Sequence, residues 1–182
     1  MKWDFRLTKA EWLIAPIGSI ISAVFTIIAM VNHPSYSPYV NYLSDLGVKG
    51  VSSWFFNSGV IIAGICGILF CIMLYRRFRN NNITFLGLSF VALVGVGVVN
   101  ETHEPFHATI SGIFFGLFGL SLLLLRNLWK VDKNLFYYSI LTAAIAISFI
   151  VLNDIPFLEH LAAASMVVWS IMAGLKLAAN KI

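Results

Sequence analysis

Six long apolar segments constrain the fold of this chain more than any other feature. They cover about residues 11–31, 53–75, 84–99, 105–125, 135–152 and 156–177. A helix needs about 20 apolar residues to cross a bilayer, with a range near 17–25. The composition is 59% hydrophobic and 11% charged, whereas a soluble domain carries about 25% charged residues. We therefore predict an all-α polytopic membrane protein, in which residues 1–182 form a single transmembrane domain with a bundle of six transmembrane helices.

The basic residues lie almost entirely on one side of this predicted bundle. Eleven of the twelve Lys and Arg residues, Arg76, Arg77 and Arg126 among them, fall in the termini and even-numbered loops, and Lys49 is the exception. Such residues mark the cytoplasmic side and meet anionic lipid. We expect a multi-pass protein of the cell membrane with both termini cytoplasmic. Its net charge of +4 then indicates membrane lipids as partners and no nucleic acid.

The opposite side gathers the histidines and most of the acids. All four His residues and five of the eight acids fall in the odd-numbered loops or beside them: His33, Asp45, Glu101, His103, Glu104, His107, Asp154, Glu159 and His160. The loop of about residues 32–52 also carries three tyrosines and two prolines before residue 43. Aromatic rings favour the membrane interface, so we predict that this loop covers the outer mouth of the bundle as a lid.

The odd-numbered segments end in similar motifs. They end in Val31-Asn32-His33, Val99-Asn100-Glu101 and Leu152-Asn153-Asp154. Five residues separate the second motif from His107, and five separate the third from His160. One interpretation is three helical hairpins whose polar tips converge on one outward pocket. The other is that Asn and Asp only cap helices here.

The histidines and acids indicate a metal site or a capped helix end. His103-Glu104-Pro105-Phe106-His107 matches the HExxH pattern, which holds zinc when both histidines share a helix face. Pro105 lies inside the pattern, so that spacing is not assured. A looser site for zinc or another divalent metal would draw on His107, His160, His33, His103 and Asp45. Glu104 or Glu101 would then be the base that activates bound water. The alternative is that these groups only cap helices and meet water.

Two further features indicate where a substrate would bind. His107, Ser111 and Phe115 recur every four residues, a spacing that lines one helix face and predicts a pocket beneath the mouth. Ser111 and Asp154 are therefore candidate substrate contacts. Ser44 beside Asp45 is a weaker candidate nucleophile, because Ser-Asp more often caps a turn.

Three pieces of the chain resemble the membrane family DUF998: His33 to Gly47 with its Tyr-Leu-Ser-Asp-Leu-Gly run, Phe56-Asn57-Ser58-Gly59, and His107 followed by Ser111 and Phe114-Phe115. Members of that family are six-helix proteins without a settled activity. They resemble distantly the Frag1/DRAM/Sfk1 group, some of whose members act on or near GPI-anchored lipids. The resemblance covers nearly the whole chain and implies attention to Ser44, Asp45, Asn57 and His107, with Asn57 a candidate substrate contact.

These features lead to one expected function and two alternatives. We expect a membrane-embedded hydrolase or transferase acting on a lipid or lipid-linked substrate at the outer leaflet. The first alternative is a non-enzymatic protein that binds or transports a lipid or small solute. The second is an assembly partner, because Gly59, Ala63 and Gly67 and the pair Gly112 and Gly116 have the four-residue spacing of close helix contacts and could support a homo-oligomer.

Overall fold

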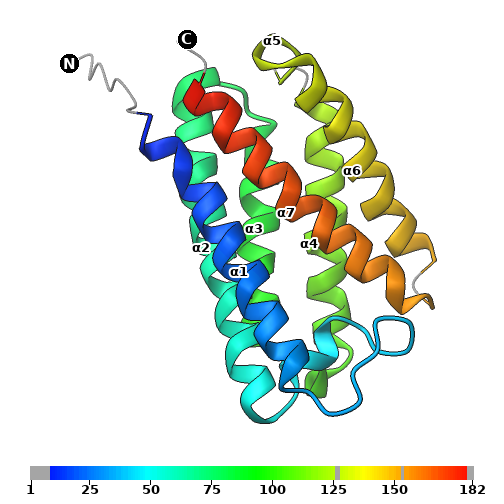
Figure 1. Ribbon diagram of the computed structural model, residues 1–182. Coiled ribbons are helices and arrows are strands. Elements are labelled where there is room, and N and C mark those ends of the chain that lie inside the picture. The colour runs from blue at the N-terminus through cyan, green and yellow to red at the C-terminus, as the bar shows by residue number, and fades with distance from the viewer. Residues whose placement is uncertain (1–8, 126–127, 153, 180–182) are drawn as a thin grey trace.

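The computed structural model describes residues 9–125, 128–152 and 154–179, and within them every regular element is a helix (Figure 1). The six long helices are α1 (Ile14–Val31), α2 (Gly50–Phe78), α3 (Ile83–Val98), α4 (Phe106–Leu124), α6 (Lys133–Val151) and α7 (Pro156–Ala179). The short ones are η1 (Glu11–Leu13), η2 (Ser44–Gly47), η3 (Glu101–His103) and α5 (Leu128–Val131). The residues outside this description include Lys2, Arg6, Arg126, Asn153 and Lys181.

The six predicted segments are confirmed as helices, with differences at their ends. Five are long and apolar enough to cross a membrane, counting η1 with α1, and α3 is shorter at 16 residues. The chain is therefore a multi-pass membrane protein. Helix α2 extends past its predicted bounds at both ends. At its C-terminal end Arg76 and Arg77 occupy the last turn, where cations are favoured by the helix dipole. It ends at Arg79, whose φ of 49° is left-handed. Helix α5 was not predicted.

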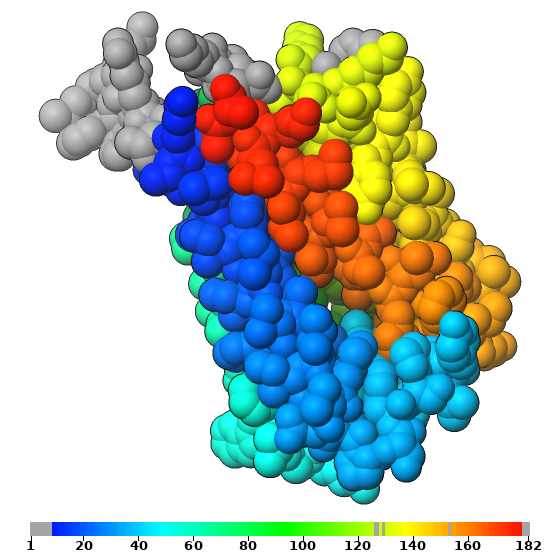
Figure 2. Space-filling model, in the orientation of Figure 1, coloured from blue at the N-terminus to red at the C-terminus, as the bar shows by residue number. Residues whose placement is uncertain are grey.

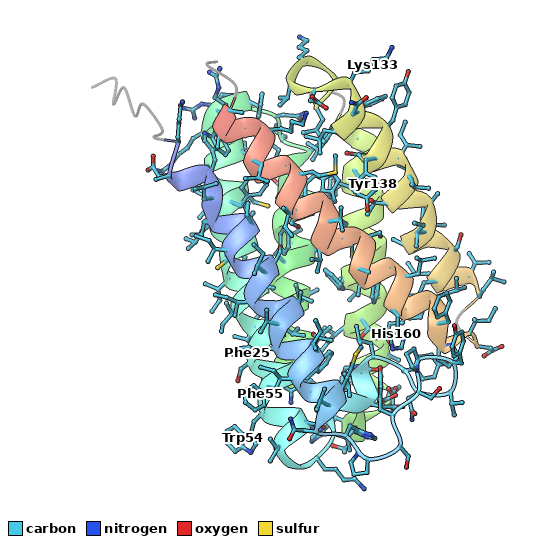
Figure 3. All side chains as sticks on the ribbon, in the orientation of Figure 1. Phe25, Trp54, Phe55, Lys133, Tyr138 and His160 are labelled. Carbon is cyan, nitrogen blue, oxygen red and sulfur yellow. The ribbon has the colours of Figure 1, made fainter. Side chains whose placement is uncertain are left out.

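The helices pack as a ring in chain order. Each long helix contacts the next one along the chain, and α1 closes the ring against α7. The ring has two distinct ends, which Figure 3 shows through Lys133 at one end and His160 near the other. The basic end carries Arg76, Arg77, Lys130 and Lys176, whereas the loop end carries the loop of residues 32–49, which we call the lid loop.

Large side chains fill the ring towards its basic end. Phe118 of α4 packs edge-on against Phe90 of α3 at 5.7 Å and against Trp169 of α7 at 5.5 Å between ring centroids. Trp169 and Phe118 are fully buried. The indole Nε1 of Trp169 donates to Ser139 Oγ at 2.8 Å, which satisfies a polar group that hydrocarbon could not. This half of the ring is therefore a packed core.

Small residues mark the close helix contacts, as predicted for Gly59 and Gly67. A Cβ at Gly59 would lie 3.0 Å from Phe25 Cβ of α1, and one at Gly67 would overlap the Phe90 ring. Gly116 faces Ile150 of α6 in the same chain at 3.6 Å, whereas Gly112 has open space beside it. Gly59, Gly67 and Gly116 therefore serve the packing of one chain, and the homo-oligomer stays a prediction.

Candidate functional site

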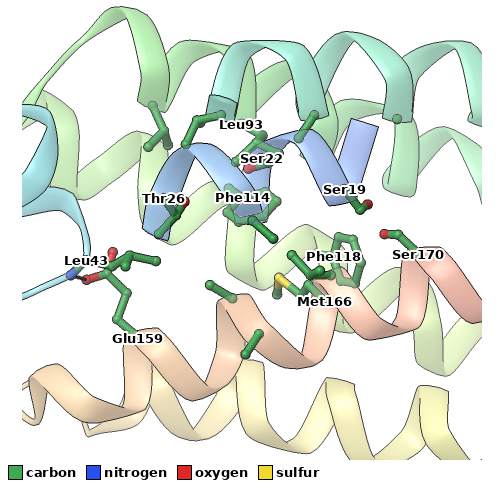
Figure 4. Close-up of a pocket in the computed structure, with 18 of the residues that line it drawn as sticks. Ser19, Ser22, Thr26, Leu43, Leu93, Phe114, Phe118, Glu159, Met166 and Ser170 are labelled. Carbon is green, nitrogen blue, oxygen red and sulfur yellow. Dashed lines mark hydrogen bonds between the residues drawn. The ribbon is translucent and has the colours of Figure 1, made fainter. Parts of the chain in front are cut away.

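An apolar pocket of about 330 Å³ occupies the ring towards its loop end. Side chains of α1, α2, α3, α4 and α7 line it, and most of them are apolar or small. Figure 4 shows Glu159 and Leu43 at one end of this pocket and Ser19, Phe118 and Ser170 at the other. The pocket therefore extends from the packed core to the lid loop.

The pocket lies along the line where α1 and α7 separate. At the basic end the two helices meet closely, because Gly174 leaves room for Pro16 and a Cβ there would also lie 2.6 Å from Trp12 O. Nearer the loop end the facing positions are small, with Ala23 on α1 and Ala163 and Ala164 on α7 lining the pocket. Figure 2 shows the surface hollowed between α1 in blue and α7 in orange.

A second pocket of about 370 Å³ lies beside the first and is more polar. We call it the polar mouth, and its lining includes Tyr42, Ser44, Glu101, Glu104, His107, Ser111, Phe149 and Glu159. Ser111 of α4 and Glu159 of α7 line both the apolar pocket and the polar mouth. The two spaces therefore meet at these two side chains.

The lid loop is attached to the first turns of α7 by three contacts. The backbone N–H of Leu43 donates to Glu159 Oε2 at 2.6 Å. Tyr36 Oη donates to His160 Nε2 at 2.5 Å. The Tyr39 ring stacks on Phe157 with centroids 5.3 Å apart. The prediction that this aromatic loop covers the mouth is confirmed, and the contacts explain its aromatic content.

Hydrogen bonds within the lid loop and to α2 fix its shape. Asp45 Oδ2 accepts from the Tyr42 backbone N–H at 3.1 Å and from Asn41 Nδ2 at 3.0 Å. Asn57 Nδ2 on α2 donates to Gly47 O at 3.1 Å, and Ser52 Oγ donates to Leu46 O at 2.8 Å. Asn57 therefore holds η2 against α2, and it lines neither pocket.

The two buried or half-buried histidines share one hydrogen-bond pattern. His107 Nδ1 lies 2.6 Å from Val99 O, and His160 Nδ1 lies 3.0 Å from Pro156 O. A carbonyl oxygen only accepts, so Nδ1 carries the proton in both rings and Nε2 of the neutral ring is an acceptor. His107 Nε2 lies 3.4 Å from Ser111 Oγ, and His160 Nε2 accepts from Tyr36. His107 and His160, which follow similar motifs in the sequence, therefore also share one tautomer, with the proton on Nδ1.

The acids of the polar mouth change the proton affinity of their neighbours. Burial, then a hydrogen bond with Asp45 and then the nearby negative charges raise the pKa of Glu101 to about 8. Its Oε2 is buried and has no hydrogen-bond partner among the described residues. Burial, followed by the charges of Glu159 and Asp45, also raises the pKa of Tyr36. The mouth therefore favours protonated groups or a bound cation over further negative charge.

The structure brings some of the predicted site residues together and separates others. Five of the predicted residues line the polar mouth: Ser44, Glu101, Glu104, His107 and Ser111. His33 packs against Tyr36 in the lid loop, and Asp154 is exposed in the turn just before α7. His103 is exposed in η3 with Nδ1 3.1 Å from Asn100 Oδ1, whereas His107 is buried in α4. The HExxH letters thus fall on two separate elements.

The described residues contain no group of three His, Cys, Asp or Glu side chains arranged to hold a metal ion. Glu101 and Asp45, which share a hydrogen bond, are both carboxylates. His107 and His160 point to backbone carbonyls through Nδ1. The zinc site expected from the sequence therefore stays a prediction without a converged ligand set.

The sequence did not mark three residues that shape the site as individual site residues. Glu159 joins the two pockets and holds the lid loop, and Tyr36 and Tyr42 contribute to the lid and the mouth. An acid within an apolar membrane segment is a functional candidate by default, so Glu159 carried a usable signal. The tyrosines carried none beyond the aromatic content of the loop.

The family model described as "Protein of unknown function (DUF998)" matches residues 16–176 of the chain. No curated protein and no solved structure matches it. The match covers the lid loop, the polar mouth and all of the long helices except the first two residues of α1 and the last three of α7. The resemblance seen in the sequence is thereby confirmed, while the distant likeness to the Frag1/DRAM/Sfk1 group stays a prediction. The chain belongs to the DUF998 family.

Proposed function

We propose that the protein binds a membrane amphiphile, either a lipid or a lipid-linked molecule. Its alkyl chain would occupy the apolar pocket and its head group the polar mouth. The observation that carries this proposal is that the two spaces, one apolar and one acid-lined, meet at Ser111 and Glu159. Ligand pockets typically measure about 300–1,000 Å³, so 330 Å³ suits one alkyl chain better than a whole two-chain lipid.

The hollow between α1 and α7 supports entry from the bilayer and not from water. Small side chains at Ala23 and Ala163 leave the apolar pocket near the lipid-facing surface. An alkyl chain already in lipid gains little hydrophobic free energy by moving sideways into a protein. Selectivity would therefore come from the polar mouth, where head-group hydrogen bonds and charges differ between lipids.

We propose that the loop end faces outward, so that the amphiphile comes from the outer leaflet. Arg76, Arg77 and Lys130 at the other end support this orientation by the positive-inside rule. A path through to the basic end has less support, because Phe118 and Trp169 fill that half of the ring. Binding within one leaflet therefore fits better than transport across the membrane.

The test is the lipid content of the purified protein by mass spectrometry. Ala163→Phe places a ring inside the apolar pocket, and Ala144→Phe places the same ring on the exposed face of α6 as a matched control. We expect the wild type and Ala144→Phe to retain a specific lipid and Ala163→Phe to lose it. Equal lipid content in all three folded proteins would contradict the proposal.

A further inference from the structure

We propose that Ser111 and His107 form an acyl-transfer site, in which Ser111 is the nucleophile and His107 the general base. The substrate class is an ester of a long-chain fatty acid. This inference rests on the proposed function, because it uses the alkyl chain in the apolar pocket to place the ester group.

The hydrogen bonds around His107 set the required proton states. Val99 O accepts the Nδ1 proton at 2.6 Å, which leaves the lone pair on Nε2 facing Ser111 Oγ at 3.4 Å. A base oriented by a third group beside a hydroxyl nucleophile is the arrangement that activates serine. Such bonds are commonly long without substrate and shorten in its complex. The ring is only 4% exposed, so bulk water does not compete for Nε2.

The position of Ser111 matches the position of an ester in a lipid. In an acyl lipid the carbonyl joins the apolar chain to the polar head group. Ser111 lines both the apolar pocket and the polar mouth, and His107 lines the mouth. An alkyl chain in the pocket with its head group in the mouth therefore brings its carbonyl carbon to the level of Ser111.

The reaction needs only the ester and an acceptor with a hydroxyl group. Ser111 Oγ bonds to the carbonyl carbon as its proton passes to His107 Nε2. The carbon–oxygen bond to the leaving alcohol then breaks, and the alcohol departs with that proton. Water or a second lipid hydroxyl attacks the acyl-serine, gives its proton to Nε2, and Ser111 leaves with it. Water yields a fatty acid, whereas a lipid hydroxyl yields a new ester.

Ser44, the nucleophile considered from the sequence, fits this role less well. It is buried in η2 of the lid loop. It also lines the mouth but not the apolar pocket, so it would lie beyond the ester on the head-group side.

A long-chain alkyl fluorophosphonate in lipid nanodiscs tests the site. Attack on phosphorus by an activated serine expels fluoride and leaves a stable adduct, which intact mass and peptide mapping detect. We expect one adduct on Ser111 in the wild type and in Ser148→Ala, which removes an exposed serine of α6. Ser111→Ala should give none, and His107→Gln should react on the order of 10²-fold more slowly, the lower end for loss of a general base.

Binding of a fluorescent long-chain lipid by the same samples separates this inference from the proposed function. Lipid binding with no adduct, an adduct on another serine, or unslowed labelling of His107→Gln would overturn the acyl-transfer site and leave amphiphile binding intact. If the folded wild type neither binds the lipid nor reacts with the fluorophosphonate, the proposed function and the acyl-transfer site are both overturned. Ser111→Ala removes one half-buried hydroxyl, so it keeps the test decisive if His107→Gln fails to fold.

Discussion

Replacing Glu159 by alanine should release the lid loop from α7. The Glu159 carboxylate is 7% exposed and accepts from the Leu43 backbone N–H at 2.6 Å. The Ser44 backbone N–H donates to the same carboxylate. Alanine removes both acceptors and leaves two backbone donors of the lid loop without partners.

The size of the effect follows from these two bonds. A buried donor left without its partner costs about 1–3 kcal/mol, so leaving two of them unsatisfied costs roughly 3 kcal/mol, within that range. Each 1.4 kcal/mol is a tenfold change in an equilibrium constant. The open state of the lid loop should therefore become on the order of 10²-fold more populated. Glu159→Gln keeps one oxygen acceptor without its charge, so it should have a smaller effect.

Amide hydrogen exchange followed by mass spectrometry measures this opening. Peptides that contain Leu43 and Ser44 should exchange faster in Glu159→Ala by that factor, while peptides of α2 near Phe70 should keep the wild-type rate. Asp154→Ala is the control, because it removes an exposed acid next to α7. Wild-type exchange at Leu43 in the folded Glu159→Ala variant would refute the role of Glu159 in holding the lid loop.

Three further predictions concern stability, measured by thermal unfolding in detergent. The folded protein holds the Glu101 proton up to about pH 8, against an ordinary pKa of 4.5, so the wild type should lose stability as pH rises between these values. Glu101→Gln should flatten that dependence, and an equal slope would contradict the raised pKa. Asp132 caps α6 and pairs with Lys176 at 2.8 Å. Asp132→Ala should therefore lower the free energy of unfolding by about 0.5–2 kcal/mol, and an unchanged unfolding midpoint would contradict this. Its lowered pKa means that this stability is lost as pH falls below the ordinary value of 3.8. Gly174→Ala should lower the free energy of unfolding by about 1–3 kcal/mol through overpacking against α1. Gly112→Ala meets open space and should leave the stability unchanged. Equal unfolding midpoints for the two variants would refute the close contact at Gly174.

The sequence predicts the helices of this fold but not their order around the ring. Long apolar runs and their flanking basic residues locate six helices to within a few residues. Lipid and protein core are both apolar, so hydrophobicity does not reveal which side of a membrane helix faces its neighbours. The spacing of Gly59 and Gly67 predicted close contacts on α2, but it did not show that α1 and α3 make them. The closure of the ring by Gly174 against Pro16 was therefore not predictable. Nor was α5, which is a single helical turn in a loop.

Local spacing predicted part of the site, and long-range contacts decided the rest. The four-residue period of His107, Ser111 and Phe115 places Ser111 and Phe115 in the pocket lining, as expected. The bond between Leu43 and Glu159 joins residues 116 positions apart, so no local pattern could have shown it. His103 ends η3, and Glu104 and Pro105 separate it from α4, so it does not share a helix face with His107.

Photo-crosslinking with a long-chain lipid that carries a diazirine near the end of its chain tests the central claim most directly. The lipid is added to the outer leaflet of vesicles, and crosslinked residues are identified by mass spectrometry. We predict crosslinks to pocket-lining residues of α1 and α7, such as Thr26 and Met166, that are lost in Ala163→Phe and kept in Ala144→Phe. Crosslinks confined to outward-facing residues such as Leu141 and Val168, equal in all three proteins, would contradict an amphiphile bound inside the ring.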